Sequence, residues 1–389
     1  MNEKELIFSL NEKIFQLNNL IDTGIELSRF DKRDVLFDLA LERACALTNA
    51  SSALIKIENK ENLSTPQKFI FPPGTDPESI VNCEHKIESE FEFNNKLYSI
   101  VLSEKETRSG PTSFGELDEL LLSAINRQIR VVIENEYLQQ QNLIKQRIEQ
   151  ELNVAALIQQ RIIPKKLPEI EGYDLSGINI PSREVGGDYF DCIRLGNGKY
   201  AFIIADVTGK GIAAALLVNT LNASLYSYLD FKLPLSEMTE KLNKLIYSST
   251  PSDKFITFFI AVLDSNSGEL DIVNAGHNPI LLFRKNGKLE KIDAGGVGLG
   301  MFNLGIPYSG QKLCMESGDR LFLYTDGIPE AMNENEEEYS DERMIKYVES
   351  HSEMSSDQLI DALVKDVKNF TGSTEQSDDI TALCLIRKN

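Results

Sequence analysis

The sequence has no tryptophan, 3 histidines and 5 cysteines among its 389 residues. None of the cysteines belongs to a CxxC pair, so the sequence predicts neither a thiolate zinc site nor a disulfide framework. They are scattered along the chain at Cys45, Cys83, Cys192, Cys314 and Cys384. A reducing, cytoplasmic location is the simplest expectation for such a chain.

Positive charge is also scarce, because 60 acidic residues outnumber 40 basic ones and the formal net charge is -20. This balance argues against a nucleic-acid-binding protein, which needs a basic footprint, and against binding to anionic membranes. It is compatible with a cation site. The opening residues, MNEKELIFSLNEK, lack the apolar core of a signal peptide. We also expect no uncharged apolar run of about 18 residues that would span a membrane.

The length predicts two or three domains, at about 100–200 residues each. Helical apolar spacing over residues 4–30 and in DKRDVLFDLALERACALTNA precedes two strand-like stretches, SSALIKIENK and KIESEFEFNNKLYSIVLSEK. A long helical pattern then starts at Phe114. We therefore expect an α/β domain over residues 1–138.

This first domain resembles a GAF domain over about residues 22–138. The resemblance rests on GIELSRFDKRDVLFDLALERACALTNASSALIKI and FGELDELLLSAINRQIRVVIENEYL. It implies a sensory domain that takes a small ligand or a protein, or that dimerises. A plain α/β dimerisation domain without a ligand is the alternative, because the middle of the segment, where GAF ligand pockets usually lie, is short.

Residues 139–165 are expected to form a helical linker. An apolar track with heptad-like spacing crosses it, interrupted at Gln141 and Glu151. The track comprises Tyr137, Ile144, Ile148, Ala155, Ile158 and Ile162. It favours a parallel coiled coil and hence a homodimer, whereas the alternative is a single amphipathic helix packed on one domain. Pro164 is expected to end the helix.

Residues 166–389 read as a second domain in which aspartates lie at the edges of apolar strands, beside turns. They are Asp188 in REVGGDYFD, Asp206 in KYAFIIADVTGKG, Asp326 in DRLFLYTDGIPEA and Asp378 in EQSDDITALCLI. Gathered carboxylates repel each other unless they are protonated or bind a cation, and hard divalent cations prefer oxygen ligands. A single Asp-Gly pair is usually an ordinary turn, but the four sites together predict a metal cluster. The two glycines before Asp188 would aim its carboxylate at that cluster.

The motifs EVGGDYFD, ADVTGKGIAAALLV, NAGHNP, LYTDGIPEA and SDDITAL occur in the order typical of PPM-type serine/threonine phosphatases of the RsbU/SpoIIE group. The second domain therefore resembles this family, and the resemblance extends over about residues 155–387. It implies a four-layer αββα sandwich, an α/β (α+β) fold. It also implies two Mn²⁺ or Mg²⁺ ions between two antiparallel sheets.

The resemblance assigns metal-binding and catalytic roles to Asp188, Asp206, Asp326 and Asp378, with the backbone carbonyl of Val207 as a further ligand. Asp206 would bridge both ions, and Asp326 and Asp378 would bind the second ion. Asp188 would bind an ion directly or hold a bound water, and Asp379 ranks behind Asp378 as a ligand. Two such ions lower the pKa of water and stabilise the attacking and leaving oxygens of an in-line displacement at phosphorus.

Two further residues have open roles. His277, in NAGHNP, is either a catalytic acid or a structural residue of a turn. Arg183 precedes Asp188 at a spacing similar to that of a phosphate-binding arginine in eukaryotic relatives, but a solvated arginine is the alternative. The histidine that follows the bridging aspartate in the eukaryotic branch is absent, because this stretch reads Asp206-Val207-Thr208-Gly209.

The resemblance implies hydrolysis of phosphoserine or phosphothreonine on a partner protein, which in such relatives is commonly a STAS-domain anti-sigma-factor antagonist. The N-terminal domain would regulate this activity through the helical linker. A catalytically weak or inactive signalling scaffold is the main alternative, and a hydrolase of small phosphoesters is a third possibility.

Overall fold

The computed structural model describes residues 3–27, 33–61, 65–107, 110–251, 253–303, 305 and 307–388. The chain divides into two compact units, Met1–Arg147 and Ile148–Asn389. Each is described by itself below.

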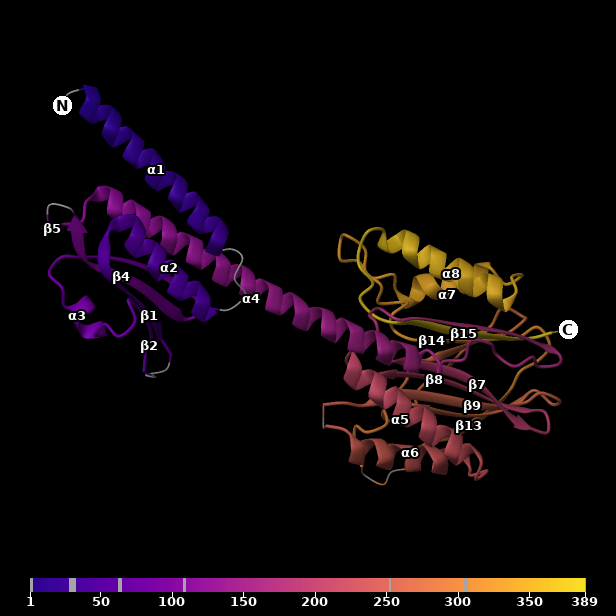
Figure 1. Ribbon diagram of the computed structural model, residues 1–389. Coiled ribbons are helices and arrows are strands. Elements are labelled where there is room, and N and C mark those ends of the chain that lie inside the picture. The colour runs from indigo at the N-terminus through magenta and orange to yellow at the C-terminus, as the bar shows by residue number, and fades with distance from the viewer. Residues whose placement is uncertain are drawn as a thin grey trace. The chain divides into compact units, whose positions relative to one another are not determined.

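The N-terminal unit is a sheet packed against helices. The sheet has the order β2-β1-β4-β3, with β5 beside β4, and every pairing in it is antiparallel. Its strands are β1 (Ala50–Asn59), β2 (Gln67–Phe71), β3 (Lys86–Phe93), β4 (Lys96–Thr107) and β5 (Gly110–Thr112). The helices are α1 (Glu3–Leu27), α2 (Arg33–Thr48), α3 (Pro77–Val81) and the start of α4 (Glu116–Gln159) (Figure 1).

One apolar core joins this sheet to α2 and to the start of α4. Phe37 and Leu41 of α2 and Ile125 and Ile129 of α4 are fully buried in it, together with Ile100 of β4. The core explains why α4 has apolar residues at helical spacing in its first half.

The exposed part of α4 has a different pattern. Ile144 and Ile148, two residues of the heptad-like track, are 54% and 52% exposed. Pro164 was expected to end this helix. The helix ends earlier, at Gln159.

The C-terminal unit contains two five-stranded antiparallel sheets. One has the order β13-β10-β9-β8-β7 and the other the order β12-β11-β14-β15-β6. The first comprises β7 (Asp188–Gly196), β8 (Lys199–Val207), β9 (Ile256–Asp264), β10 (Glu269–Ala275) and β13 (Gly310–Cys314). The second comprises β6 (Tyr173–Ile180), β11 (Ile280–Phe283), β12 (Leu289–Ile292), β14 (Arg320–Tyr324) and β15 (Ile380–Arg387).

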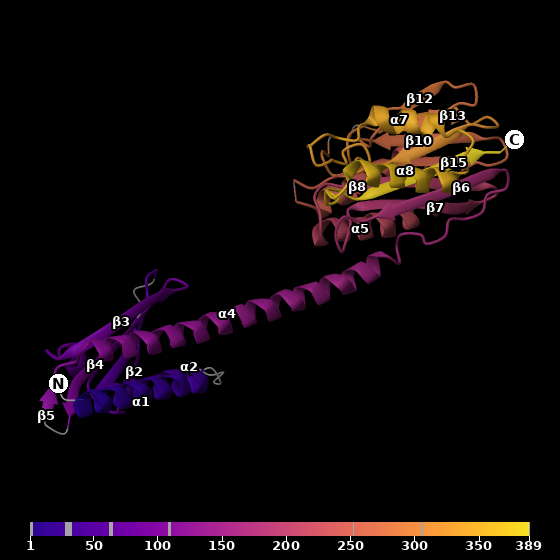
Figure 2. The ribbon, with the colours of Figure 1, turned by 90° about the horizontal axis from the view of Figure 1, so that it is seen from above.

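Helices cover the outer face of each sheet. α5 (Ile212–Leu229) and α6 (Leu235–Ser249) lie on the first sheet, and α7 (Asp341–Ser350) and α8 (Ser356–Thr371) lie on the second (Figures 1 and 2). Alternate residues of one strand face different layers, as the period of two demands. Phe202 and Ile204 of β8 join the core between the sheets, while Ala201 and Ile203 join the core under α5 and α6. The predicted αββα sandwich is therefore confirmed.

Among the described residues, α5 is the one helix long and apolar enough, by length and composition alone, to cross a membrane. The expectation that no uncharged run of this length exists was wrong, because Ile212–Leu229 carries no charge. Val218, Leu221 and Leu225 are fully buried in the core under the first sheet. Packing within the domain accounts for the apolar residues on this side of α5. Ile212 and Leu216 of the same helix are exposed.

Candidate active site

Aspartates from both sheets meet at one edge of the sandwich. Asp188 opens β7 and pairs in register with Asp206 near the end of β8. Asp326 follows β14 in the facing sheet, and Asp378 precedes β15. Because β14 and β15 run antiparallel, the end of one and the start of the other share this edge.

Burial and mutual repulsion raise the pKa values of the carboxylates in this cluster. Burial raises the pKa of Asp206 to about 7, and the charges of Asp326, Asp378 and Asp379 add to the rise. Burial also raises the pKa of Asp188 well above its ordinary value, with Asp206 as the next cause. The pKa of Asp326 is raised by burial and then by Asp378. The site therefore holds more negative charge than its surroundings neutralise, which favours binding of a cation.

Two threonines of the second sheet fix the Asp188 carboxylate. Thr325 donates a hydrogen bond from Oγ1 to Asp188 Oδ2 at 2.7 Å, and Thr381 donates another to the same oxygen. Asp188 is almost fully buried. Its orientation is thus set by residues of the opposite sheet rather than by its own strand.

Asp379 is occupied by the loop that leads to Asp188. Its Oδ1 accepts hydrogen bonds from the backbone N–H and the hydroxyl of Ser182, at 2.7 and 2.9 Å. Its Oδ2 accepts from the N–H groups of Gly187 and Asp188, at 2.6 and 3.3 Å. With both oxygens engaged by this loop, Asp379 is a positioning residue for the segment that leads to Asp188.

The close approach of this loop explains the two glycines before Asp188. A Cβ on Gly186 would lie 2.4 Å from Asp379 Oδ2, and a Cβ on Gly187 would lie 2.9 Å from the carbonyl oxygen of Val207. Neither distance leaves room for a side chain. The glycines therefore bring the backbone of β7 against Asp379 and the end of β8.

The last residue of α4 reaches the same loop. Gln159 is 5% exposed, and its side chain donates from Nε2 to the Gly186 carbonyl at 2.7 Å. Its Oε1 accepts from the Gly186 N–H at 3.0 Å. Both backbone groups of Gly186 are thus satisfied by one side chain from the linker helix.

His277 has a structural environment. Its Nδ1 is 2.8 Å from Thr257 Oγ1 and its Nε2 is 3.0 Å from the carbonyl oxygen of Tyr324. Burial lowers the pKa of His277 to about 4. A neutral ring with both nitrogens engaged is a poor proton donor, so the geometry favours the structural role. Arg183 is exposed and forms no ion pair within the described parts of the chain.

The donor set suits a divalent cation, since Asp206, Asp326 and Asp378 offer hard oxygen ligands around a local excess of negative charge. Within the described ranges, however, no three Asp, Glu, His or Cys side chains stand together as a formed ligand set. The carboxylate of Asp378 points instead to Lys210, with Oδ2 and Nζ 3.0 Å apart. The carbonyl oxygen of Val207 lies next to Gly187.

Sequence reasoning did not identify the side chains that support these carboxylates. Thr325 and Thr381 lie in the motifs LYTDGIPEA and SDDITAL. Threonine is common in strands, so its presence there did not indicate a role in the site. Lys210 stood in ADVTGKG, next to a glycine, and was not singled out. Gln159 looked like one more polar residue of a Gln-rich helix. Local sequence contains no signal for its contact with Gly186, 27 residues away.

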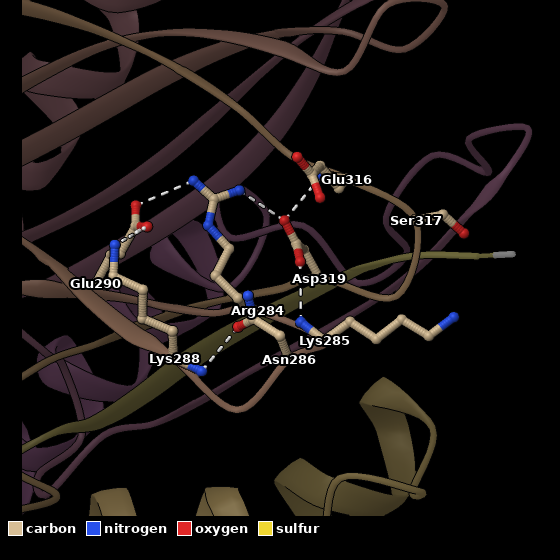
Figure 3. Close-up of a pocket in the computed structure, with 8 residues that line it drawn as sticks. All are labelled: Arg284, Lys285, Asn286, Lys288, Glu290, Glu316, Ser317 and Asp319. Carbon is tan, nitrogen blue, oxygen red and sulfur yellow. Dashed lines mark hydrogen bonds and ion pairs between the residues drawn. The ribbon is translucent and has the colours of Figure 1, made fainter.

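A separate open pocket of about 480 Å³ lies at the other end of β14 (Figure 3). Figure 3 shows Arg284 between two acidic side chains, with ion pairs of 3.0 Å to Glu290 and 2.7 Å to Asp319. Lys288 also pairs with Glu290, at 3.0 Å. Because these charges satisfy one another and Asp319 precedes β14 whereas Asp326 follows it, this pocket is not part of the carboxylate cluster.

Comparisons with known proteins agree with this geometry. Residues 196–388 match the family model described as Stage II sporulation protein E (SpoIIE). The chain is 29% identical over 251 residues to phosphoserine phosphatase RsbU of Bacillus subtilis, covering 63% of this chain and 72% of that protein. It is 24% identical over 311 residues to Protein IcfG of Synechocystis sp., covering 70% of this chain. That match spans only 49% of the length of Protein IcfG.

A solved structure shows the same fold. The SiaA-PP2C domain of Pseudomonas aeruginosa superposes with a TM-score of 0.56 at 18% identity, covering 63% of this chain and 99% of that one. The motif order, the αββα sandwich, the aspartates at one edge and the family match lead to one conclusion. The C-terminal unit of this chain belongs to the SpoIIE family of PP2C-type phosphatases.

Proposed function

We propose that this chain is a metal-dependent protein phosphatase that hydrolyses phosphoserine or phosphothreonine on a partner protein. The observation that carries the proposal is the convergence of Asp188, Asp206, Asp326 and Asp378 from two facing sheets, with raised pKa values at three of them. The similarity to a phosphoserine phosphatase supports the choice of substrate bond.

The carboxylates would hold two Mn²⁺ or Mg²⁺ ions. Asp206, whose carboxylate interacts electrostatically with Asp326 and Asp378, would be a ligand of both ions, and Asp326 and Asp378 would hold the second. The backbone carbonyl of Val207 would be a further ligand. Bound divalent cations supply the positive charge that activates water and neutralises the phosphoryl group during displacement.

The protein's own residues keep this arrangement in register. Thr325 and Thr381 orient Asp188, and Asp379 holds the loop that delivers it. His277 would not donate the leaving-group proton, because both its nitrogens are engaged and burial lowers its pKa to about 4. No cysteine or serine nucleophile is required by this chemistry.

The N-terminal unit would act as a GAF-like sensor. A pocket of about 270 Å³ in this unit supports a small ligand. Its lining combines aromatic and charged side chains: Arg33, Asp34, Phe37, Ile57, Gln67, Phe69, Lys96 and Tyr98. Such a mixture suits a compact ligand with both polar and apolar parts.

The linker would join sensor and catalyst. α4 is continuous from the N-terminal core to Gln159, and a continuous helix transmits a rotation that a flexible linker cannot. The exposed Ile144 and Ile148 support a second copy as partner, in a parallel coiled coil. The bond between Gln159 and Gly186 gives the helix a direct connection to the loop before Asp188.

The family resemblance makes a phosphorylated STAS-domain protein, an anti-sigma-factor antagonist, the expected substrate. The test uses the full chain with phosphorylated STAS-domain proteins from the same genome. Phosphate release is measured with EDTA, Mn²⁺ or Mg²⁺, beside the Asp206→Asn variant. Release that depends on the metal and on Asp206 is expected. Metal binding without release from any phosphoserine or phosphothreonine protein would instead identify a signalling scaffold.

A further inference from the structure

Lys210 is held against the carboxylate cluster by contacts that cross the sandwich. It lies in the turn between β8 and α5, and its Nζ is 3.0 Å from Asp378 Oδ2. The same Nζ donates a hydrogen bond to the carbonyl oxygen of Ser377. Asp378 and Ser377 precede β15 in the second sheet. The turn that follows β8 of the first sheet therefore contacts the segment that precedes β15 of the second sheet.

Lys210 brings a positive charge to the carboxylates assigned to the second ion. Asp326 and Asp378 are the two carboxylates assigned to the second ion, and Lys210 is paired with the carboxylate of Asp378. The ammonium group of Lys210 therefore neutralises one of the two carboxylates at this expected metal position.

The surroundings of Lys210 allow its side chain to move away from Asp378. Its side chain is 32% exposed, and that of Asp378 is 38% exposed. The residue lies between Gly209 and Gly211, with φ angles of 85° and 82° in the region that favours glycine. A partly exposed ion pair on such a turn is weak enough to be replaced by a stronger cation.

We propose that Lys210 is an exchangeable counter-ion for Asp378, which the second divalent cation must displace to bind between Asp326 and Asp378. This inference rests on the proposed function, because it concerns the same carboxylates. It assigns Lys210 to the control of metal affinity: the lysine lowers the affinity of the second position and leaves the first position almost unaffected.

The test is a titration of the metal-free full chain with Mn²⁺, in which free Mn²⁺ is followed by electron paramagnetic resonance. For Lys210→Met we expect the weaker binding step to become about two- to fivefold tighter, since an exposed ion pair contributes at most about that much. The stronger step should keep its dissociation constant. Lys210→Arg retains the charge and should remain close to the wild type.

The matched control is Lys254→Met. The Nζ of Lys254 lies beside Gly209 of the same turn, and Lys254 forms no ion pair among the described residues. The Lys254→Met substitution therefore removes one positive charge near the site and leaves the ion pair of Asp378 in place. An equal tightening in both variants would show a general charge effect and overturn the proposal.

Other outcomes separate this inference from the proposed function. Two-step Mn²⁺ binding by the wild type with no change or a weaker second step in Lys210→Met would overturn the counter-ion role alone. Failure of the wild type to bind either Mn²⁺ or Mg²⁺ would overturn both. If Lys210→Met shows a lower melting temperature than the wild type, Lys210→Gln, which retains a polar end, replaces it.

Discussion

The side-chain amide of Gln159 brackets the backbone of Gly186, accepting from its N–H at 3.0 Å and donating to its carbonyl at 2.7 Å. Gly186 lies two residues before Asp188, whose carboxylate belongs to the candidate metal site. The end of the linker helix and the start of the catalytic strand are thus joined through one buried side chain.

The first prediction concerns this contact. Gln159→Ala leaves both buried backbone groups of Gly186 without a partner, and each unsatisfied group costs about 1–3 kcal/mol. We expect the free energy of unfolding of the C-terminal unit to fall by about 2–6 kcal/mol, with weaker Mn²⁺ binding. Urea unfolding and Mn²⁺ titration measure the two effects. Gln160, the exposed neighbour of Gln159, serves as the control. A loss of stability of the same size in Gln160→Ala would contradict this explanation.

The second prediction concerns the glycines before Asp188. In Gly187→Ala the new Cβ would lie 2.9 Å from the Val207 carbonyl oxygen, so the backbone of β7 or β8 must move. Overpacking of this kind costs about 1–3 kcal/mol, and we expect a loss of Mn²⁺ affinity as well. Gly310→Ala is the control, since its Cβ would lie 3.8 Å from the carbonyl oxygen of Ile272, an ordinary van der Waals distance. Normal metal binding by Gly187→Ala would show that the close approach is not needed.

The third prediction concerns pH and His277. The pKa of His277 is lowered from 6.5 to about 4, so the unfolded chain takes up a proton there before the folded chain does. Below pH 6.5, this difference reduces the stability of the wild type by roughly 1.4 kcal/mol per pH unit until about pH 4. His277→Asn loses this dependence. The stability advantage of the wild type over the variant should therefore shrink from pH 8 to pH 4.5.

Chemical unfolding of both proteins across this pH range measures that advantage, and all other titrating groups cancel in the comparison. Phosphatase activity of folded His277→Asn should stay within about tenfold of the wild type. A general acid contributes about 10²–10⁴-fold, so a loss of that size in a folded variant that still binds metal would place His277 in the reaction.

The fourth prediction separates catalysis from stability at Asp206. Because the pKa of Asp206 is raised to about 7, its charge destabilises the metal-free fold increasingly as the pH rises to that value. Asp206→Asn should raise the melting temperature of the metal-free protein by a few degrees at pH 8 and by less at pH 5.5. The same variant should have no measurable phosphatase activity. Differential scanning calorimetry with EDTA and a phosphate-release assay give the two readouts, and near-normal activity at saturating Mn²⁺ would reject the proposed bridging role.

The fifth prediction concerns the linker. Ile144 lies on the heptad-like track and Leu143 does not, although they are 54% and 65% exposed. Ile144→Glu should therefore dissociate a coiled-coil dimer, whereas Leu143→Glu should leave it intact. Light scattering of the full chain measures the mass. A wild-type monomer, or equal dissociation by both substitutions, would argue against pairing along this track.

Much of the C-terminal fold could be predicted from the sequence because its strands are short apolar runs between clear turns. The site aspartates were visible for the same reason, since each follows or precedes such a run. Their order along the chain also matched a known family. The helix end was harder, because α4 stops at Gln159 and not at Pro164. A side-chain contact with Gly186, 27 residues away, accompanies this stop, and local sequence contains no signal for it.

The residues that support the site were harder to predict for the same physical reason. Thr325 and Thr381 act on Asp188 across 137 and 193 residues of chain, and Lys210 reaches Ser377 across 167. Such contacts depend on how two sheets face each other, which periodicity within one strand does not encode. Their chemistry becomes visible only when both sheets are in place.

The attachment of Asp188 to hydroxyl groups of the opposite sheet has a consequence for how the enzyme loses activity. The carboxylate cannot keep its orientation if the sheets separate, because Thr325 and Thr381 would move away with the second sheet. Heating should therefore yield no partly melted species that still turns over substrate. The inactivation curve and the melting curve of the sandwich should coincide, so that activity reports the integrity of the whole domain.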